Sequence, residues 1–145
     1  MVKTDPTARP RAQAPERQFV IIGAGMCGLY QLHKLLDMGA DVTVLERGDD
    51  VGGTWYWNRY PGCRFDSESY TYGYSFSKEL LAEWDWTEHF SPQPENLRYV
   101  NHVVDKFDLR KHVQFGCNLK RAVWDDEHHI WTLELAEGRT LTCRY

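Results

Sequence analysis

The segment 52–66 holds a dense group of side chains that could serve redox chemistry. It reads GGTWYWNRYPGCRFD, so two glycines are followed by aromatic residues, then by Arg64 and finally by the carboxylate of Asp66. Adjacent glycines let the backbone pass close to a phosphate group, and aromatic rings pack well against a flat heterocycle. The segment therefore favours a binding site for a cofactor that contains both a phosphate group and a flat heterocycle.

A second motif precedes that segment. Residues 23–28 read GAGMCG, which has the spacing GxGxxG. In dinucleotide-binding proteins the first glycine permits a tight turn, the second lets backbone amides approach a pyrophosphate, and the third lets helix and strand pack closely. Glu46 follows Gly28 at close to the spacing of roughly 20 residues at which a carboxylate reaches the ribose hydroxyls. These residues predict a dinucleotide site.

Plainer interpretations exist for each feature. Glycines also relieve crowding in ordinary turns, and aromatic residues in loops usually pack in the core. Asp66 could simply cap the segment that begins at Ser67. For the GxGxxG motif, the elements expected on either side of it favour the dinucleotide site.

Those elements form a predicted βαβ unit. Residues 18–22 are a β-branched and aromatic run that predicts a buried parallel strand. Leucines recur at helical spacing from Met26 to Met38, and Gly39 supplies the stop. Residues 41–46 predict a second strand, and such crossovers are almost always right-handed.

The chain after Glu46 differs from an NAD dehydrogenase, in which a helix would lead to a third parallel strand. Residues 48–77 instead predict a long ordered loop rich in glycine and aromatic residues. This departure favours FAD as the dinucleotide.

The second half of the chain predicts a helix and a small sheet. Prolines open a helix over about 92–107, and 113–115 predicts a short strand. Residues alternate with period two over 119–124, 130–135 and 140–145. We therefore expect an α/β fold: a Rossmann-like FAD-binding domain of the two-dinucleotide-binding flavoprotein type, with a three-stranded antiparallel meander. It should occupy residues 18–145, behind a flexible N-terminal arm over residues 1–17.

Composition limits the partners. The 145 residues are 42% hydrophobic and carry a net charge of -4 from interspersed acids and bases, which argues against nucleic acid and against an anionic membrane. Adjacent strand residues point to opposite faces, so His128 and His129 predict no metal site. Widely spaced cysteines predict reduced thiols and a cytoplasmic protein: Cys27, Cys63, Cys117 and Cys143.

The chain resembles the N-terminal FAD-binding part of the Baeyer–Villiger monooxygenase family, the class B flavoprotein monooxygenases. The resemblance is carried by the GxGxxG motif, by Glu46-Arg47, and above all by the pattern GxWx4YPGx3D over residues 53–66. It implies an FAD that is reduced by NADPH and reacts with O2 to a C4a-peroxyflavin, which converts a ketone to an ester or lactone.

The resemblance also implies residue roles. Asp66 would be catalytic, because in the family this carboxylate orients an arginine supplied from later in the chain. Trp55 would lie beside the isoalloxazine, Arg64 and Phe65 on the nicotinamide side, and Leu119 at the adenine end. The expected cofactor-binding residues are Gly23, Gly25, Met26, Gly28, Glu46, Arg47, Gly53, Thr54, Trp55, Trp57, Arg64, Phe65, Asp66, Tyr72 and Leu119.

The sequence contains a single GxGxxG. We therefore expect the NADPH site and the catalytic arginine to come from a C-terminal remainder or a second polypeptide, and this chain alone to be incomplete and inactive. An open sheet edge should expose apolar surface beside Val20, Ile22, Val42 and Val44. The alternatives are an N- or S-oxidising flavin monooxygenase, and a non-catalytic FAD-binding or assembly module.

Overall fold

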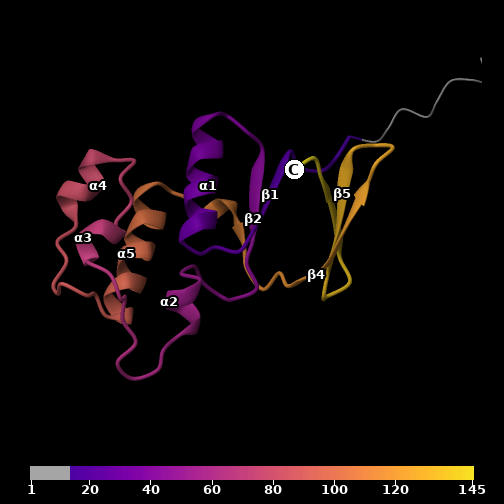
Figure 1. Ribbon diagram of the computed structural model, residues 1–145. Coiled ribbons are helices and arrows are strands. Elements are labelled where there is room, and N and C mark those ends of the chain that lie inside the picture. The colour runs from indigo at the N-terminus through magenta and orange to yellow at the C-terminus, as the bar shows by residue number, and fades with distance from the viewer. Residues whose placement is uncertain (1–13) are drawn as a thin grey trace, which may run out of the picture.

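The computed structural model describes residues 14–145, whose elements lie in three layers (Figure 1). Helices cover one side of a parallel sheet, and a separate antiparallel sheet lies on the other side. Residues 1–13 of the expected arm fall outside the described residues. The last residue of that arm is held by the fold, because the N–H of Arg17 donates to the carbonyl of Thr142 at 3.1 Å.

The parallel sheet contains the expected βαβ unit. Strand β1 (Phe19–Ile22) pairs in parallel with β2 (Val42–Leu45), and α1 (Met26–Asp37) connects them. The short β3 (Val113–Gln114) pairs with the other edge of β2, which gives the order β1-β2-β3. Gly39 follows α1 with φ of 73°, a left-handed conformation that glycine adopts readily at a helix end.

Strand β2 lies at the centre of the core. Val42 and Val44 are 5% and 0% exposed and pack on the helical side, whereas Leu45 packs with the antiparallel sheet. The expectation of exposed surface at Val42 and Val44 is wrong, because neighbouring layers cover both faces of β2. Val20 is also partly buried against the antiparallel sheet, and Ile22 alone of the four is exposed, at 52%.

The expected loop over 48–77 contains two single-turn helices, α2 (Thr54–Trp57) and α3 (Ser69–Tyr72). Helix α4 (Lys78–Glu83) follows it. One turn holds too few residues to produce a periodic pattern, so the sequence does not indicate these short helices. The long helix α5 (Gln93–Lys106) begins and ends within a residue of its predicted bounds.

The antiparallel sheet is formed by three consecutive strands, β4 (Leu119–Asp125), β5 (Ile130–Leu135) and β6 (Thr140–Cys143). Beyond β6 the chain passes beside the free edge of β1, where the N–H of Val20 donates to the carbonyl of Tyr145 at 2.9 Å. The two sheets are therefore joined at this edge.

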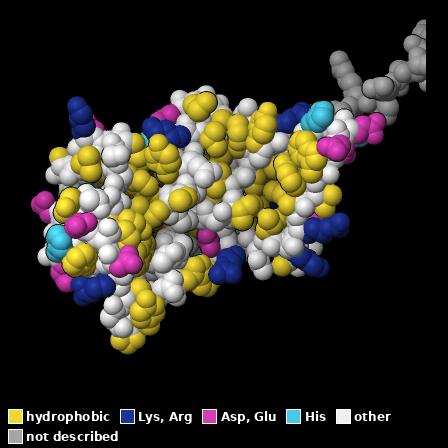
Figure 2. Space-filling view, in the orientation of Figure 1, with side chains coloured by type: hydrophobic (Ala, Val, Ile, Leu, Met, Phe, Trp, Pro, Cys, Tyr) yellow, Lys and Arg dark blue, Asp and Glu magenta, His cyan; other side chains and the backbone are white. Residues whose placement is uncertain are grey.

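Charged side chains of both signs are scattered over the face seen in Figure 2, and hydrophobic side chains gather over its middle. This distribution gives that face no extended basic stripe. No helix within residues 14–145 is long and apolar enough to cross a membrane.

Candidate functional site

The two glycine segments of the sequence meet in space. The N–H of Gly52 donates to the carbonyl of Ala24 at 3.0 Å, and a Cβ built on Gly53 would lie 2.7 Å from the Cα of Gly25. Gly53 also has φ of 53°, which side chains rarely tolerate. The second glycine pair is therefore a close-packed partner of the GxGxxG turn, which an ordinary turn would not require.

Gly28 performs the packing role that its place in the motif predicts. A Cβ at Gly28 would lie 2.0 Å from the carbonyl oxygen of Gly23, so only glycine lets α1 approach this closely. Helix α1 begins at Met26, which directs its N-terminal backbone amides toward the glycine segments.

Two adjoining cavities, of about 530 and 340 Å3, lie along these segments. Both are lined by Gly23, Gly25, Gly53 and Thr54. The larger adds four of the other expected binding residues: Glu46, Arg47, Trp57 and Leu119. The smaller adds Met26, Gly28, Trp55 and Tyr72. The structure thus brings together most of the predicted set, from elements far apart in sequence.

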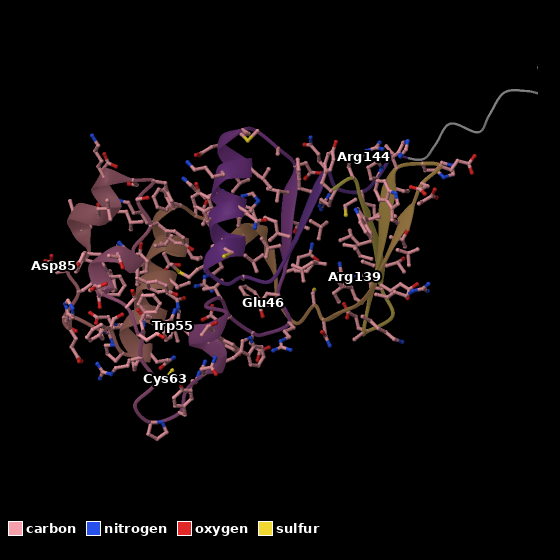
Figure 3. All side chains as sticks on the ribbon, in the orientation of Figure 1. Glu46, Trp55, Cys63, Asp85, Arg139 and Arg144 are labelled. Atoms are coloured by element: carbon pink, nitrogen blue, oxygen red, sulfur yellow. The ribbon has the colours of Figure 1, made fainter. Side chains whose placement is uncertain are left out.

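Glu46 is a buried carboxylate at the end of β2 and is 4% exposed (Figure 3). One of its oxygens accepts the N–H of Ala24 at 2.7 Å, and the other accepts the N–H of Gly48 at 2.7 Å. A carboxylate has about four lone-pair positions, so acceptor capacity remains for the hydroxyls of a ribose.

Arg47 lies beside Glu46 with its guanidinium 4.6 Å from the ring centroid of Trp57. Such cation–π stacking holds the guanidinium plane against the wall of the larger cavity. No carboxylate within residues 14–145 forms an ion pair with Arg47. Its N–H donors are therefore available to an anionic ligand.

Trp55 and Tyr72 form the far wall of the smaller cavity. The indole N–H of Trp55 donates to the hydroxyl of Tyr72 at 2.7 Å, and the Phe65 ring packs 3.9 Å from the Tyr72 ring. Burial raises the pKa of Tyr72 above its ordinary value. The hydroxyl therefore stays protonated at neutral pH, and the cluster offers an aromatic wall without negative charge.

Comparison with known proteins agrees with this geometry. Residues 21–84 match the family described as NAD(P)-binding Rossmann-like domain. A monooxygenase of Pseudomonas putida that acts on 2-oxo-Δ3-4,5,5-trimethylcyclopentenylacetyl-CoA is 47% identical over 93% of this chain and 25% of the relative. Phenazine N-monooxygenase PhzNO1 of Lysobacter antibioticus is 46% identical over 87% of this chain and 24% of the relative.

A Baeyer–Villiger monooxygenase of Pseudooceanicola batsensis is 44% identical over 87% of this chain and 23% of the relative. The crystal structure of OTEMO in complex with FAD and NADP aligns with a TM-score of 0.87 at 46% identity, over 92% of this chain and 25% of that one. This chain is related to the N-terminal part of Baeyer–Villiger monooxygenases. It spans about a quarter of the length of these relatives.

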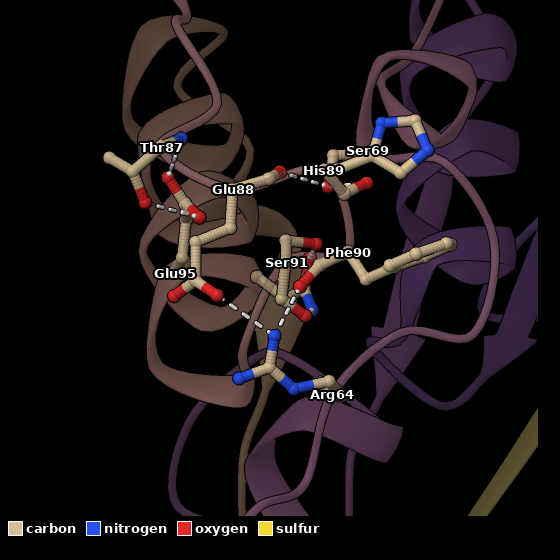
Figure 4. A network of polar contacts seen from close by, with 9 residues as sticks. Arg64, Ser69, Thr87, Glu88, His89, Phe90, Ser91 and Glu95 are labelled. Atoms are coloured by element: carbon tan, nitrogen blue, oxygen red, sulfur yellow. Dashed lines mark hydrogen bonds and ion pairs between the residues drawn. The ribbon is translucent and has the colours of Figure 1, made fainter.

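The end of the Baeyer–Villiger pattern lies outside both cavities. Arg64 is exposed, and its guanidinium donates to Glu88 at 2.9 Å and to the carbonyl of Phe90 at 2.8 Å (Figure 4). Asp66 is also exposed, and its carboxylate makes no hydrogen bond within residues 14–145. Helix α3 begins at Ser69, so Asp66 does not cap it. Arg64, Phe65 and Asp66 are the expected site residues that line neither cavity.

Gln93 begins the segment Gln93-Pro94-Glu95, which also resembles the family but for which the resemblance implied no role, and it is a structural partner of the Baeyer–Villiger pattern. Its side-chain N–H donates to the carbonyl of Trp55, and its backbone N–H donates to the carbonyl of Cys63 at 2.9 Å. The larger cavity is also lined by Asn58, at an unspecified position of that pattern, and by four residues outside any motif: Ile22, Leu45, Cys117 and Asn118. A glutamine at the start of a helix carries no signal of such long-range contacts.

Proposed function

We propose that this chain supplies the FAD-binding part of an NADPH- and O2-dependent Baeyer–Villiger monooxygenase that converts ketones to esters or lactones. The observation that carries the proposal is the meeting of Gly25 with Gly53 beside the buried carboxylate of Glu46. A turn this close to a helix N-terminus suits a diphosphate, and a fixed acid suits the adjacent ribose. The names of the relatives support the reaction class.

The proposed FAD would be held along both cavities. Glu46 would accept hydrogen bonds from the ribose, and Arg47 would face the negatively charged part of the dinucleotide. Trp55 and Tyr72 would lie on the side of the flavin ring. Bound there, the flavin would supply the hydride acceptance and oxygen transfer that amino-acid side chains cannot.

We propose Asp66 as the catalytic carboxylate of the assembled enzyme, with Arg64 and Phe65 near the nicotinamide. The exposure of Asp66 and its lack of a hydrogen-bond partner within the described residues support this role, because the carboxylate is free to orient an arginine from elsewhere. That arginine and the NADPH site would come from a C-terminal remainder or a second polypeptide. Four free cysteines support a reducing, cytoplasmic location.

A second candidate is N-oxidation of a heteroaromatic compound. The phenazine N-monooxygenase relative favours it, because its identity of 46% lies between the 47% and 44% of the two other relatives named above. Both reactions would use the same dinucleotide site.

The test is to purify the protein at its natural length and record its visible spectrum, then supply NADPH and O2 with either a cyclic ketone or phenazine. The proposal expects bound flavin and an ester or lactone from the ketone. N-oxide formation without ester would favour the second candidate. A protein that neither carries flavin nor binds added FAD would contradict both.

A further inference from the structure

A series of polar contacts joins Asn101 of α5, through Arg110, to the residues just before the second glycine pair. The guanidinium of Arg110 donates to Asp50 at 2.5 Å and to the side-chain oxygen of Asn101 at 2.7 Å. The same oxygen of Asp50 accepts the N–H of Val51 at 2.7 Å. Asn101 in turn donates to the carbonyl of Leu97 at 3.0 Å.

The residues at the end of this series of contacts determine where the glycine turn lies. Val51 is fully buried, and Gly52 follows it, hydrogen-bonded to Ala24. A Cβ on Gly52 would lie 2.6 Å from a methyl group of Leu97, so α5 abuts the turn directly. Helix α5 therefore contacts the turn through Leu97, and its Asn101 holds Arg110, which pairs with Asp50 just before the turn.

We propose that Arg110 is a positioning residue for the dinucleotide site: it fixes the turn at 51–53 against the GxGxxG segment so that both sets of backbone amides face the diphosphate. This inference rests on the FAD site proposed above. The planar guanidinium suits the task, because separate N–H groups reach Asp50 and Asn101 at once. A lysine has a single nitrogen and lacks the two separate nitrogens that reach Asp50 and Asn101 here.

The contact is poorly suited to stabilising the fold by itself. The side chains of Arg110 and Asp50 are 39% and 41% exposed, and exposed ion pairs contribute little to folding stability. Asp105 also lies 3.6 Å from Arg110, but its side chain is 68% exposed. An effect of Arg110 on FAD affinity that exceeds its effect on unfolding would therefore identify positioning.

The test compares Arg110→Met with Lys111→Met in the protein at its natural length. Lys111 is the next residue and forms an exposed ion pair with Asp108 that does not contact the glycine turn. After removal of bound flavin, FAD dissociation constants are measured by fluorescence titration, and thermal midpoints are measured on the same apoproteins. We expect Arg110→Met to weaken FAD binding roughly ten-fold, whereas Lys111→Met leaves it unchanged, with similar midpoints for both.

Two further variants keep the test decisive if Arg110→Met does not fold. Asp50→Asn should weaken FAD binding in the same direction, and Arg110→Lys should restore part of the loss, because it keeps the contact with Asp50. Wild-type affinity in Arg110→Met, or in both milder variants, would overturn the inference. Failure of the wild-type protein to bind FAD would instead refute the proposed function, and the inference with it.

Discussion

Glu46 is a buried acid whose partners are backbone amides rather than cations. Its two oxygens tie Ala24 of the first glycine segment and Gly48 of the following loop to the end of β2. Charge-assisted hydrogen bonds of this kind are among the stronger ones in proteins. The same carboxylate therefore orders both backbone segments and presents acceptors to a ligand, so little rearrangement is needed when the ligand binds.

Gly28→Ala should destabilise the protein, because the new methyl group would lie 2.0 Å from the carbonyl oxygen of Gly23, and that backbone cannot move away without breaking the turn. We expect a loss of about 1–3 kcal/mol in the free energy of unfolding, measured by urea denaturation. Gly73→Ala is the matched control, since its methyl group would make an ordinary contact with Tyr99 at 3.4 Å. Equal stability of the two variants would show that the helix can shift away from the strand.

Asp66→Asn should leave FAD affinity and unfolding unchanged, because the side chain is exposed and lies outside both cavities. In the assembled enzyme, ester formation with NADPH should fall on the order of 100-fold, the usual cost of losing one preorganised interaction. Asp85→Asn, on the far side of the helical layer (Figure 3), serves as the control. Undiminished turnover in Asp66→Asn would remove Asp66 from the reaction.

At the scale of elements, the sequence indicates helices and strands that have a recognisable residue pattern, and it does not indicate elements that lack one. The bounds of α1 and α5 follow from apolar residues at helical spacing with glycine or proline near their ends, and those of β1 and β2 follow from short β-branched runs. Helices α2 and α3 lack any repeat, yet α2 carries Trp55 into the site. The glycine turn of the dinucleotide site was predictable from glycine spacing. The contact between Gln93 and Trp55 of α2 is a tertiary one, and no local sequence pattern indicates it.

The β4–β5 hairpin provides a pH-dependent contact. The Asp125 carboxylate, 2.8 Å from the imidazole of His128, raises the pKa of His128, and hydrogen bonds from His128 lower the pKa of Asp125. The stabilisation from His128 is fully present below the ordinary histidine pKa and is lost as the pH rises through the raised value.

Titration by NMR should show a lower His128 pKa in Asp125→Asn. Asp126→Asn should leave it near wild type, since Asp126 accepts from Trp124 instead. An unchanged pKa in Asp125→Asn would mean that the contact does not persist in solution.

At the scale of the whole molecule, the proposed function places one dinucleotide site in this chain, and Asp66 has no hydrogen-bond partner among residues 14–145. We expect residues 1–145 by themselves to form no ester from a ketone with added FAD and NADPH, because they contain a single GxGxxG. Product analysis by gas chromatography would check this. Supplying the remaining three quarters of a related monooxygenase as a second polypeptide should restore turnover. Turnover by residues 1–145 alone would contradict the proposed division of the site.

The bridge between Arg17 and Cys143 joins the segment before β1 to the last residue of β6, and nearly the whole described chain separates the two. Closing so long a loop costs conformational entropy that is recovered only when the intervening elements are already in place. This edge should therefore form late in folding, after the βαβ unit and the hairpins, whose contacts are local. The junction of the two sheets would then be the slowest part of the molecule to assemble, and the first to open when the native state fluctuates.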